Sequence, residues 1–469
     1  MTNYYGMEID WENEVHKRFS QCQDITVEKL GNQMTIFFFR HLLDYNLFQS
    51  FVTSFFEDAD RQDGLERLIQ VWNPITGHNQ EHILGQFVEK VLRGEVGGVY
   101  NGRLYTIAVG HSTSRVIMPS DRESVITGPH DAFTEDWATN LSLIRRRIQS
   151  SHLKVIKHNI GSEYPIDIFM LYIQDTAEQE IVDEAIKRIE RIQVNQALDG
   201  NVLAKRLDDA PFSVFPQWLG TERPDVVADQ LKQGKVVIVT SNSPTVIAAP
   251  AHFFDFFAVS GDAYERWHFS VFIRILRIFV FILSLMLSAF YVAITTYHYQ
   301  FIPSPLLQTM IQARYRVPFS PMIEALMIEG VVELLREAGA RLPSKIAQTI
   351  GIVGGLVIGQ AIVQAGLVSD VLIVAVAASA LSSFIVPNYT METSMRLFRF
   401  LNVILAGYLG YFGIFLFVTL FVTHLCHIKT LSKEYIMLSR FPRFTFLSYR
   451  KQPRMSAYLW NKLPSKSKR

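Results

Sequence analysis

One long apolar tract constrains the fold of this chain more than any other feature. It spans residues 346–387, and its only formal charge is Asp370. A helix needs about 20 apolar residues to cross the roughly 30 Å hydrocarbon layer of a membrane, so this tract is too long for one crossing. It therefore predicts a hairpin of two transmembrane helices, 346–365 and 367–386, with a tight turn at 366–370.

The first helix of this hairpin has two distinct faces. Glycines at four-residue spacing would let a neighbouring helix approach closely in lipid, which makes a candidate packing face of Gly351, Gly355 and Gly359. A separate stripe, roughly opposite, would face a bundle interior or a water-filled path, because an amide in lipid has no partner. This stripe consists of Val353, Val357, Gln360 and Gln364.

An apolar band beside a wettable zone can close a pore by dewetting. The two valines beside the two amides are therefore a candidate gate within a candidate pore lining. The alternative is that the valines are ordinary packing residues.

Hydrophobicity divides the chain into two parts. Strongly apolar segments begin only after Arg277, whereas residues 1–265 have the mixed composition of globular protein, enough for roughly two domains. The formal net charge of +1 gives no argument for nucleic acid as a partner. The fold class predicted is an α/β cytosolic region of two subdomains, followed by an α-helical polytopic membrane domain.

The sequence offers no motif for an enzyme. The first part contains no GxxxxGK[ST], no G-x-S-x-G and no HExxH, and the chain has only two cysteines, Cys22 and Cys426. His424, Cys426 and His427 would scatter around a helix, which disfavours a metal site. We therefore predict no catalytic residue, no cofactor and no metal.

The predicted cytosolic region consists of a lead-in at 1–30, a first subdomain at 31–125 and a second at 126–265. Asn101-Gly102 between two β-rich runs predicts a hairpin with a type I′ turn. A helix followed by two strands occurs at 81–109 and again at 225–250. This recurrence indicates either two related subdomains or a chance similarity.

A cluster of arginines lies at the end of another predicted helix. The helix is expected to begin at Ala132, with Asp131 as its N-cap, and it ends in Arg145, Arg146 and Arg147. These cations either complement the helix dipole in water or contact another domain, another subunit or an anionic headgroup.

The predicted membrane domain spans 266–427. Its crossings are expected at 278–297, 346–365, 367–386 and 400–425. Arginines before the first crossing place the N-terminal half in the cytoplasm, and the basic tail 428–469 can lie on anionic lipid on the same side. Against this topology, six cations then fall outside: Arg314, Arg316, Arg341, Lys345, Arg396 and Arg399.

An amphipathic helix is predicted at 321–338, starting at Pro321 and ending at Gly339. Its acids are Glu324, Glu329, Glu333 and Glu337. In one interpretation the helix lies on the membrane surface with its acids in water. In the other, the acids of several subunits form a vestibule that attracts cations, with Arg336 neutralising one of them.

Several motifs resemble the A subunit of the nutrient germinant receptors of bacterial spores, the GerA family. In the membrane part they are ELLREAG, RLP, IVGGLVIGQA and AGLVS, and in the first half GPHDAFTE, TNLSLIRRR, FPQ and ERPD. The resemblance covers nearly the whole chain. His130-Asp131 departs from it, because the family usually has Arg-Glu there, and any role of that arginine is in doubt here.

The resemblance implies a multi-pass subunit in the spore inner membrane, with both termini on the core side. It implies two partners, a transporter-like B subunit that binds the nutrient and a lipoprotein C subunit, in addition to membrane lipid. It also implies a homo-oligomer, with a pentamer expected, that forms a cation channel and starts germination in response to nutrients. The alternative function is a scaffold or signalling subunit of the receptor that conducts nothing.

Overall fold

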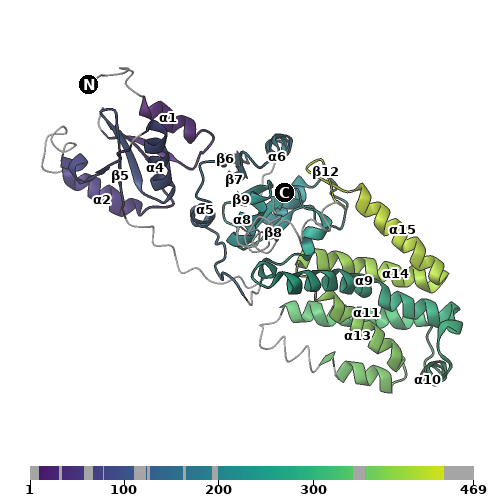
Figure 1. Cartoon of the computed structure of the whole chain (residues 1–469). Coiled ribbons are helices and arrows are strands. Elements are labelled where there is room, and N and C mark those ends of the chain that lie inside the picture. Colours follow the sequence, from purple (N-terminus) through teal and green to yellow (C-terminus); the bar gives the residue numbers. More distant parts are fainter. Residues whose placement is uncertain are drawn as a thin grey trace, which may run out of the picture. The chain divides into compact units, whose positions relative to one another are not determined.

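The computed structural model describes residues 10–30, 34–56, 67–77, 79–109, 123, 127–161, 165–192, 199–341, 354–355 and 357–437. The chain forms two compact units (Figure 1). The α/β unit comprises the described residues of Met1–Pro211, Gln217–Ala251 and Thr430–Lys433. The helical unit comprises those of Phe212–Pro216, His252–Lys429 and Glu434–Arg469.

The α/β unit contains two five-stranded antiparallel sheets. The first has the order β1-β2-β4-β5-β3, built from Thr26–Leu30, Met34–Phe38, Val96–Tyr100, Arg103–Ile107 and Asn73–Pro74. The second has the order β6-β7-β9-β10-β8, built from Leu153–Ile160, Ile166–Ile173, Val236–Thr240, Val246–Ala249 and Leu219–Thr221. In both sheets the third strand along the chain pairs with the fifth, at the edge. This shared order favours two related subdomains over a chance similarity.

Helices accompany each sheet. The first sheet is accompanied by α1 (Trp11–Arg18), α2 (Tyr45–Phe56) and α4 (Gln80–Leu92), and the second by α5 (Trp137–Arg147), α6 (Gln179–Arg191), α7 (Gly200–Leu207) and α8 (Pro224–Lys232). Successive strand residues point to opposite faces. Phe169 and Leu171 accordingly join one core with α5 and α8, whereas Met170 and Tyr172 join another with α6 and α7.

The predicted hairpin in the first sheet is confirmed. Asn101 and Gly102 have φ values of +45° and +67°, and Tyr100 pairs with Arg103 across the turn. The two positive φ values are those that a type I′ turn requires.

The expected lead-in at 1–30 is wrong for the residues that the structure describes. Residues 11–18 form α1 and residues 26–30 form β1, an edge strand of the first sheet. Trp11, Val15 and Phe19 are buried in the core beneath that sheet. The N-terminal segment folds because its apolar residues at four-residue spacing form a helix face that the sheet covers.

The structure corrects the helix before the arginine cluster. Its N-cap is Asp136, whose carboxylate accepts the N–H groups of Ala138 at 3.2 Å and Thr139 at 3.0 Å. Asp131 instead forms an ion pair with Arg147 at 2.5 Å. The helix therefore begins at residue 137, because a carboxylate directly before it satisfies its free N–H groups.

Arg145 is not a solvated cation at a helix end. It is fully buried and forms an ion pair at 2.8 Å with Asp24, which comes from the first subdomain. The alternative of a solvated helix end is therefore excluded for Arg145, whose partner is distant in the sequence but lies in the same α/β unit.

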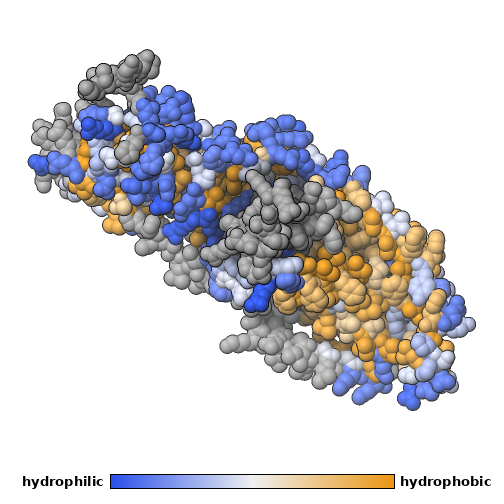
Figure 2. Space-filling model, viewed as in Figure 1, coloured by the Kyte–Doolittle hydropathy of each residue, from blue (hydrophilic) through white to orange (hydrophobic). Residues whose placement is uncertain are grey.

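The helical unit contains the longer helices. They are α9 (Trp267–Tyr297), α10 (Ser304–Arg314), α11 (Pro321–Arg341), α13 (Asp370–Ser383), α14 (Tyr389–Leu409) and α15 (Tyr411–His427), with short 3-10 turns at Phe253–Phe257, Ser260–Ala263 and Tyr299–Phe301. A small two-stranded sheet, β11 (Lys429–Thr430) and β12 (Lys433–Glu434), follows α15, and its residues Thr430–Lys433 belong to the α/β unit. Of the helices that the structure describes, α9 is the one long and apolar enough to cross a membrane. It contains the predicted crossing 278–297. Apolar side chains also cover much of the surface of this unit in Figure 2.

The turn of the predicted hairpin lies where the sequence places it. Residues 357–364 are helical, and Gly366 follows with φ +67°. The Leu367 N–H donates to the Ile362 carbonyl and the Gly366 N–H to the Val363 carbonyl, the Schellman pattern that ends a helix. Residues 346–353 and 356 of the predicted first crossing lie outside the described residues.

The second helix of the hairpin is shorter than predicted. Instead of 367–386, α13 covers 14 residues, about 21 Å at 1.5 Å per residue. The turn at its start and the bend after residue 383 take up the remaining apolar residues.

The predicted last crossing at 400–425 is wrong as a single helix. Gly410 breaks it with φ +61° and ψ −138°, a conformation open to glycine alone, so that α14 and α15 are separate helices that pack together. At Gly413 an added Cβ would lie 2.0 Å from the carbonyl oxygen of Leu405. Because the break at Gly410 splits the predicted crossing, the number of crossings stays a prediction.

Candidate functional site

The acidic face of α11 packs inside the helical unit over most of its length. The side chains of Glu324 and Glu329 are 0% exposed, whereas that of Glu337 is 61% exposed. Gly339, the predicted helix end, lies within α11, which continues to Arg341. Glu324 and Glu329 thus neither face bulk water, as on a surface helix, nor project freely toward a vestibule.

Glu329 is held by two other helices. Its carboxylate accepts the hydroxyl of Ser288 on α9 at 2.8 Å and forms an ion pair at 2.8 Å with the Nε of Arg399 on α14. The Arg399 side chain is itself 2% exposed. Both charges are therefore removed from solvent and neutralise each other.

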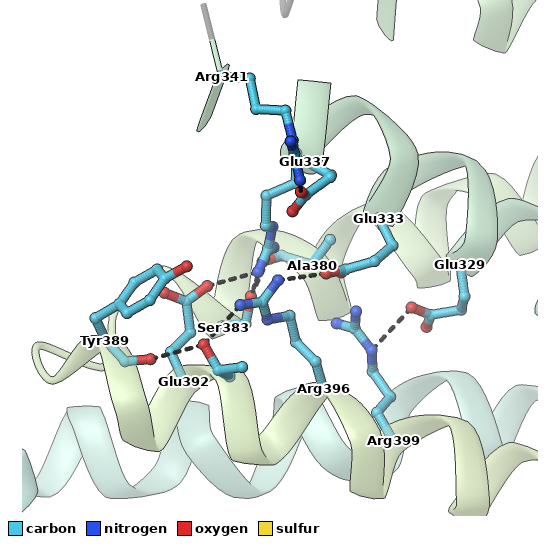
Figure 3. A network of polar contacts seen from close by, with 12 residues as sticks. Glu329, Glu333, Glu337, Arg341, Ala380, Ser383, Tyr389, Glu392, Arg396 and Arg399 are labelled. Atoms are coloured by element: carbon cyan, nitrogen blue, oxygen red, sulfur yellow. Dashed lines mark hydrogen bonds and ion pairs between the residues drawn. The ribbon is translucent and has the colours of Figure 1, made fainter. Parts of the chain in front are cut away.

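Two further ion pairs join α11 to α14 (Figure 3). Glu333 pairs with Arg396, whose other nitrogen donates to the Thr393 hydroxyl at 2.7 Å. In the opposite sense, Arg336 on α11 pairs with Glu392 on α14 at 2.5 Å. Arg336 therefore neutralises an acid of α14 rather than a neighbouring acid of its own helix.

A second polar cluster lies at the start of α11. Glu324 forms an ion pair at 3.2 Å with Arg314 of α10 and accepts the Ser369 N–H at 3.1 Å. The Ser369 hydroxyl in turn shares a hydrogen bond of 2.9 Å with the phenol of Tyr291 on α9. This cluster connects α9, α10 and α11 to the residue just before α13.

These pairs make the acidic helix electrically neutral within one chain. Each of the four acids of α11 has an arginine partner, and Arg336 balances Glu392. A neutral network does not concentrate cations as a net negative surface would. It does fix the packing of α11, because separating a buried pair leaves unpaired charges in an apolar interior.

Sequence reasoning did not find the arginine side of this network. The predicted topology places Arg396 and Arg399 on the outer side of the membrane, against the positive-inside rule. In the structure they are instead the ion-pair partners of acids of α11. The available signal was a match of spacing, since Glu329 and Glu333 lie four residues apart on α11 and Arg396 and Arg399 three apart on α14.

The candidate pore stripe is exposed in the single chain. Val357 is 56% exposed, and Gln360 and Gln364 are exposed on the same helix. The fourth member, Val353, lies outside the described residues. The three side chains are therefore free to contact water, lipid or another subunit on this face of the helix.

The candidate glycine face has no neighbour within the described chain. A Cβ at Gly355 or Gly359 would meet no atom within 4 Å, and Gly351 lies outside the described residues. A glycine that sequence reasoning missed does pack closely, because a Cβ at Gly407 would lie 2.4 Å from the sulfur of Met322. That contact lets α14 approach α11 and brings the ion pairs into reach.

The α/β unit contains one carboxyl that titrates near neutrality. Burial, followed by the charge of Asp209, raises the pKa of Asp208 from 3.8 to about 7. In the unfolded chain this carboxyl loses its proton near pH 4, so between about pH 4 and pH 7 the folded state binds more protons. Asp208 therefore lowers stability progressively as the pH rises through this window.

Replacement of Asp208 with asparagine should remove this penalty. We expect Asp208→Asn to raise the free energy of unfolding by about 1–2 kcal/mol at pH 8, a value reduced for partial solvent screening, and to change little near pH 4. Thermal unfolding of the full chain in detergent at both pH values measures this. Asp229→Asn, at an exposed carboxylate of α8, is the matched control and should change the free energy of unfolding little at either pH. An equal gain for Asp208→Asn at both pH values would contradict the assignment.

The fold and the polar network together define a class of protein. It is an α/β unit with two sheets of the same strand order, joined to a helical unit that has a candidate membrane span and a buried, neutral ion-pair network. Among the described residues, no group of three metal-ligating side chains gathers.

Comparison with known proteins narrows this class to one family. The family model described as "Bacillus/Clostridium GerA spore germination protein" matches residues 13–451. Spore germination protein GerQA of Bacillus cereus is 38% identical, over 88% of this chain and 83% of that protein. Spore germination protein KA of Bacillus subtilis is 34% identical, over 90% and 80%. The chain belongs to the GerA spore germination family.

Two other similarities are less informative. A protein of Bacillus subtilis called "Uncharacterized membrane protein YfkQ" is 37% identical, over 72% of this chain and 68% of that protein. The crystal structure of the N-terminal domain of the A subunit of the Bacillus megaterium spore germinant receptor GerK3 matches 54% of this chain and 99% of that domain, at 22% identity and a TM-score of 0.39. At that score the structural likeness supports no further conclusion.

Proposed function

We propose that this chain is the A subunit of a nutrient germinant receptor in the spore inner membrane, where it starts germination in response to nutrients. The observation that carries the proposal is the match to the GerA family over residues 13–451. The candidate span in α9 and the apolar surface of the helical unit support a place in the membrane. Both termini lie on the core side, and the chain crosses the membrane several times.

The receptor contains other subunits. A transporter-like B subunit binds the nutrient, a lipoprotein C subunit completes the complex, and several copies of this chain, five in the expected arrangement, assemble in the membrane. The face of Gly355 and Gly359 supports such an assembly, because it is open in the single chain and fits close helix packing.

The oligomer acts as a nutrient-gated cation channel. Its pore is lined by the stripe of Val357, Gln360 and Gln364, which is exposed in the single chain, and Val357 lies in the apolar band that closes it. The acids of α11 have a different role, since their charges are neutralised within the chain. They hold α11 in place instead of attracting cations.

A second candidate function is a scaffold or signalling subunit that conducts nothing. One observation favours it: the strongest acidic stripe of the chain is paired with arginines, so it supplies no negative vestibule. In this role the helical unit transmits the signal to another subunit that releases the ions.

Spores that lack the gene test the proposed function. They are challenged with a mixture of amino acids, glucose and inosine, and potassium release and loss of optical density are followed. The expected result is a loss of the response to at least one nutrient and its return when the gene is restored. An unchanged response to every nutrient would contradict a role in germination.

The gate assignment predicts a leak. Val357→Ser should lower the free energy needed to hydrate the apolar band, so that spores release potassium without nutrient. Ile358→Ser, 37% exposed and one residue further round the same helix, is a control expected to stay closed. The amount of protein is measured in the same spores. A normal amount of the Val357→Ser protein with release that still requires nutrient would exclude Val357 as the gate.

A further inference from the structure

A short excursion of the chain belongs to the helical unit. Phe212–Pro216, which we call the arm, lies in that unit, although the chain on both sides of it, up to Pro211 and from Gln217, belongs to the α/β unit. The two chain segments that flank the arm are hydrogen-bonded to each other. The Gln217 side chain accepts the Ala210 N–H at 3.0 Å and donates to the Ala210 carbonyl at 2.8 Å. Gln217 is 1% exposed, so this closure is buried.

The anchor of the arm is the ring of Phe215. It stacks on Phe398 of α14 with the ring centroids 5.1 Å apart and an angle of 13° between the planes. Phe421 of α15 meets it edge to face at 5.6 Å. Phe215 is 1% exposed, and a buried ring in such contacts contributes more than its burial alone.

Three hydrogen bonds fix the backbone and ends of the arm. Ser213 shares a hydrogen bond of 3.1 Å with the imidazole of His424 on α15. The Ser394 hydroxyl on α14 donates to the Val214 carbonyl. The Tyr435 hydroxyl donates to the Pro216 carbonyl at 2.9 Å. Polar contacts at three of its five residues hold the arm in one geometry.

The helix that receives the arm also holds α11. Ser394 and Phe398 of α14 contact the arm, whereas Arg396 and Arg399 of the same helix pair with the acids of α11. A displacement of the arm would therefore move α14, and the buried ion pairs would transmit the movement to α11.

We propose that the arm is the mechanical link through which the α/β unit sets the position of α14 and α11. This inference rests on the proposed function, since the movement is read as ion release. It also gives a role to the FPQ motif, in which Phe215 is the anchor, Pro216 ends the arm and Gln217 closes its base. The arm is covalently joined to the α/β unit at both ends, so residues added at its ends would weaken the link.

A longer arm tests the link without removing the Phe215 ring. Gly-Ser-Gly is inserted between Pro211 and Phe212 and again between Pro216 and Gln217. Neither insertion changes the residues that form the Ala210–Gln217 hydrogen bonds or the stacking of Phe215 on Phe398. Spores carrying this variant receive the mixture of amino acids, glucose and inosine. Potassium release is divided by the amount of the protein in the same spores. Phe212→Ala is the matched control, because Phe212 lies in the arm and is 100% exposed.

A mechanical link predicts a clear result. Release per protein should fall about tenfold in the insertion variant, a typical coupling effect, and stay normal in Phe212→Ala. Phe215→Leu, which keeps an apolar side chain but loses the stacked ring, should show an intermediate loss. Unchanged release per protein in the insertion variant, or a loss explained by a smaller amount of protein, overturns the link. If spores with the unmodified chain respond no better than spores without it, the proposed function fails and the link with it.

Discussion

Replacement of Arg399 with alanine is expected to lower the free energy of unfolding of the helical unit by about 3–5 kcal/mol. Its partner, Glu329, is 0% exposed and would keep only the hydrogen bond from Ser288. A buried carboxylate without a cation nearby is costly, because the apolar interior cannot solvate it as water does. Thermal unfolding of the full chain in detergent measures the loss.

A matched control and a rescue make this result specific. Arg341→Ala breaks the ion pair with Glu337, whose side chain is 61% exposed, and should cost less than about 1 kcal/mol. The double variant Glu329→Leu with Arg399→Met removes both charges and should recover most of the stability. If Arg399→Ala is no more harmful than Arg341→Ala, the buried network does not hold α11.

Loss of Asp24 should have a comparable effect on the α/β unit. Asp24 and Arg145 are both fully buried and joined by two hydrogen bonds of 2.8 Å. Apart from this pair, the Arg145 guanidinium keeps a bond of 3.3 Å to the Ser150 carbonyl and its place over the Phe39 ring. We expect Asp24→Ala to lower the free energy of unfolding by about 3–5 kcal/mol, measured by thermal unfolding.

The other neighbour of Asp24 cannot replace the arginine at neutral pH. His41 lies 3.8 Å from the carboxylate, and burial lowers the pKa of its imidazole to about 4, so the ring is neutral at pH 7. Arg145→Ala should therefore be as harmful as Asp24→Ala. Arg147→Ala, which breaks a partly exposed pair, is the control and should cost about 1 kcal/mol or less. Equal effects of Arg145→Ala and Arg147→Ala would show that the buried pair does not stabilise the α/β unit.

Patterns within one element were readable from the sequence. Asn101-Gly102 between two β-rich runs predicts the hairpin at residues 97–109, and the length of the apolar tract predicts the turn at residues 366–370. The apolar length of residues 278–297 predicts a long helix there, and α9 is long and apolar enough to be a candidate span. In each case a local physical requirement selects one conformation.

Features that depend on two distant elements were not readable in the same way. The predicted topology places Arg396 and Arg399 on the outer side of the membrane, against the charge rule, and only the packing of α14 against α11 reveals them as partners of Glu333 and Glu329. Likewise Arg145 resembles any helix-end cation until Asp24, far away in the sequence, is brought beside it. The break at Gly410 was missed because apolar composition is the same in one long helix as in two shorter ones.

Cation flux through the purified chain tests the central claim most directly. The full chain is reconstituted in liposomes loaded with potassium, and release is compared between the unmodified chain and Val357→Ser, with the oligomeric state of both checked in detergent. A cation channel with its gate at Val357 predicts little release from the unmodified chain and rapid release of potassium, but not chloride, from the variant. Assembled oligomers of both proteins that release no potassium would contradict the channel and leave the non-conducting scaffold as the function of this subunit.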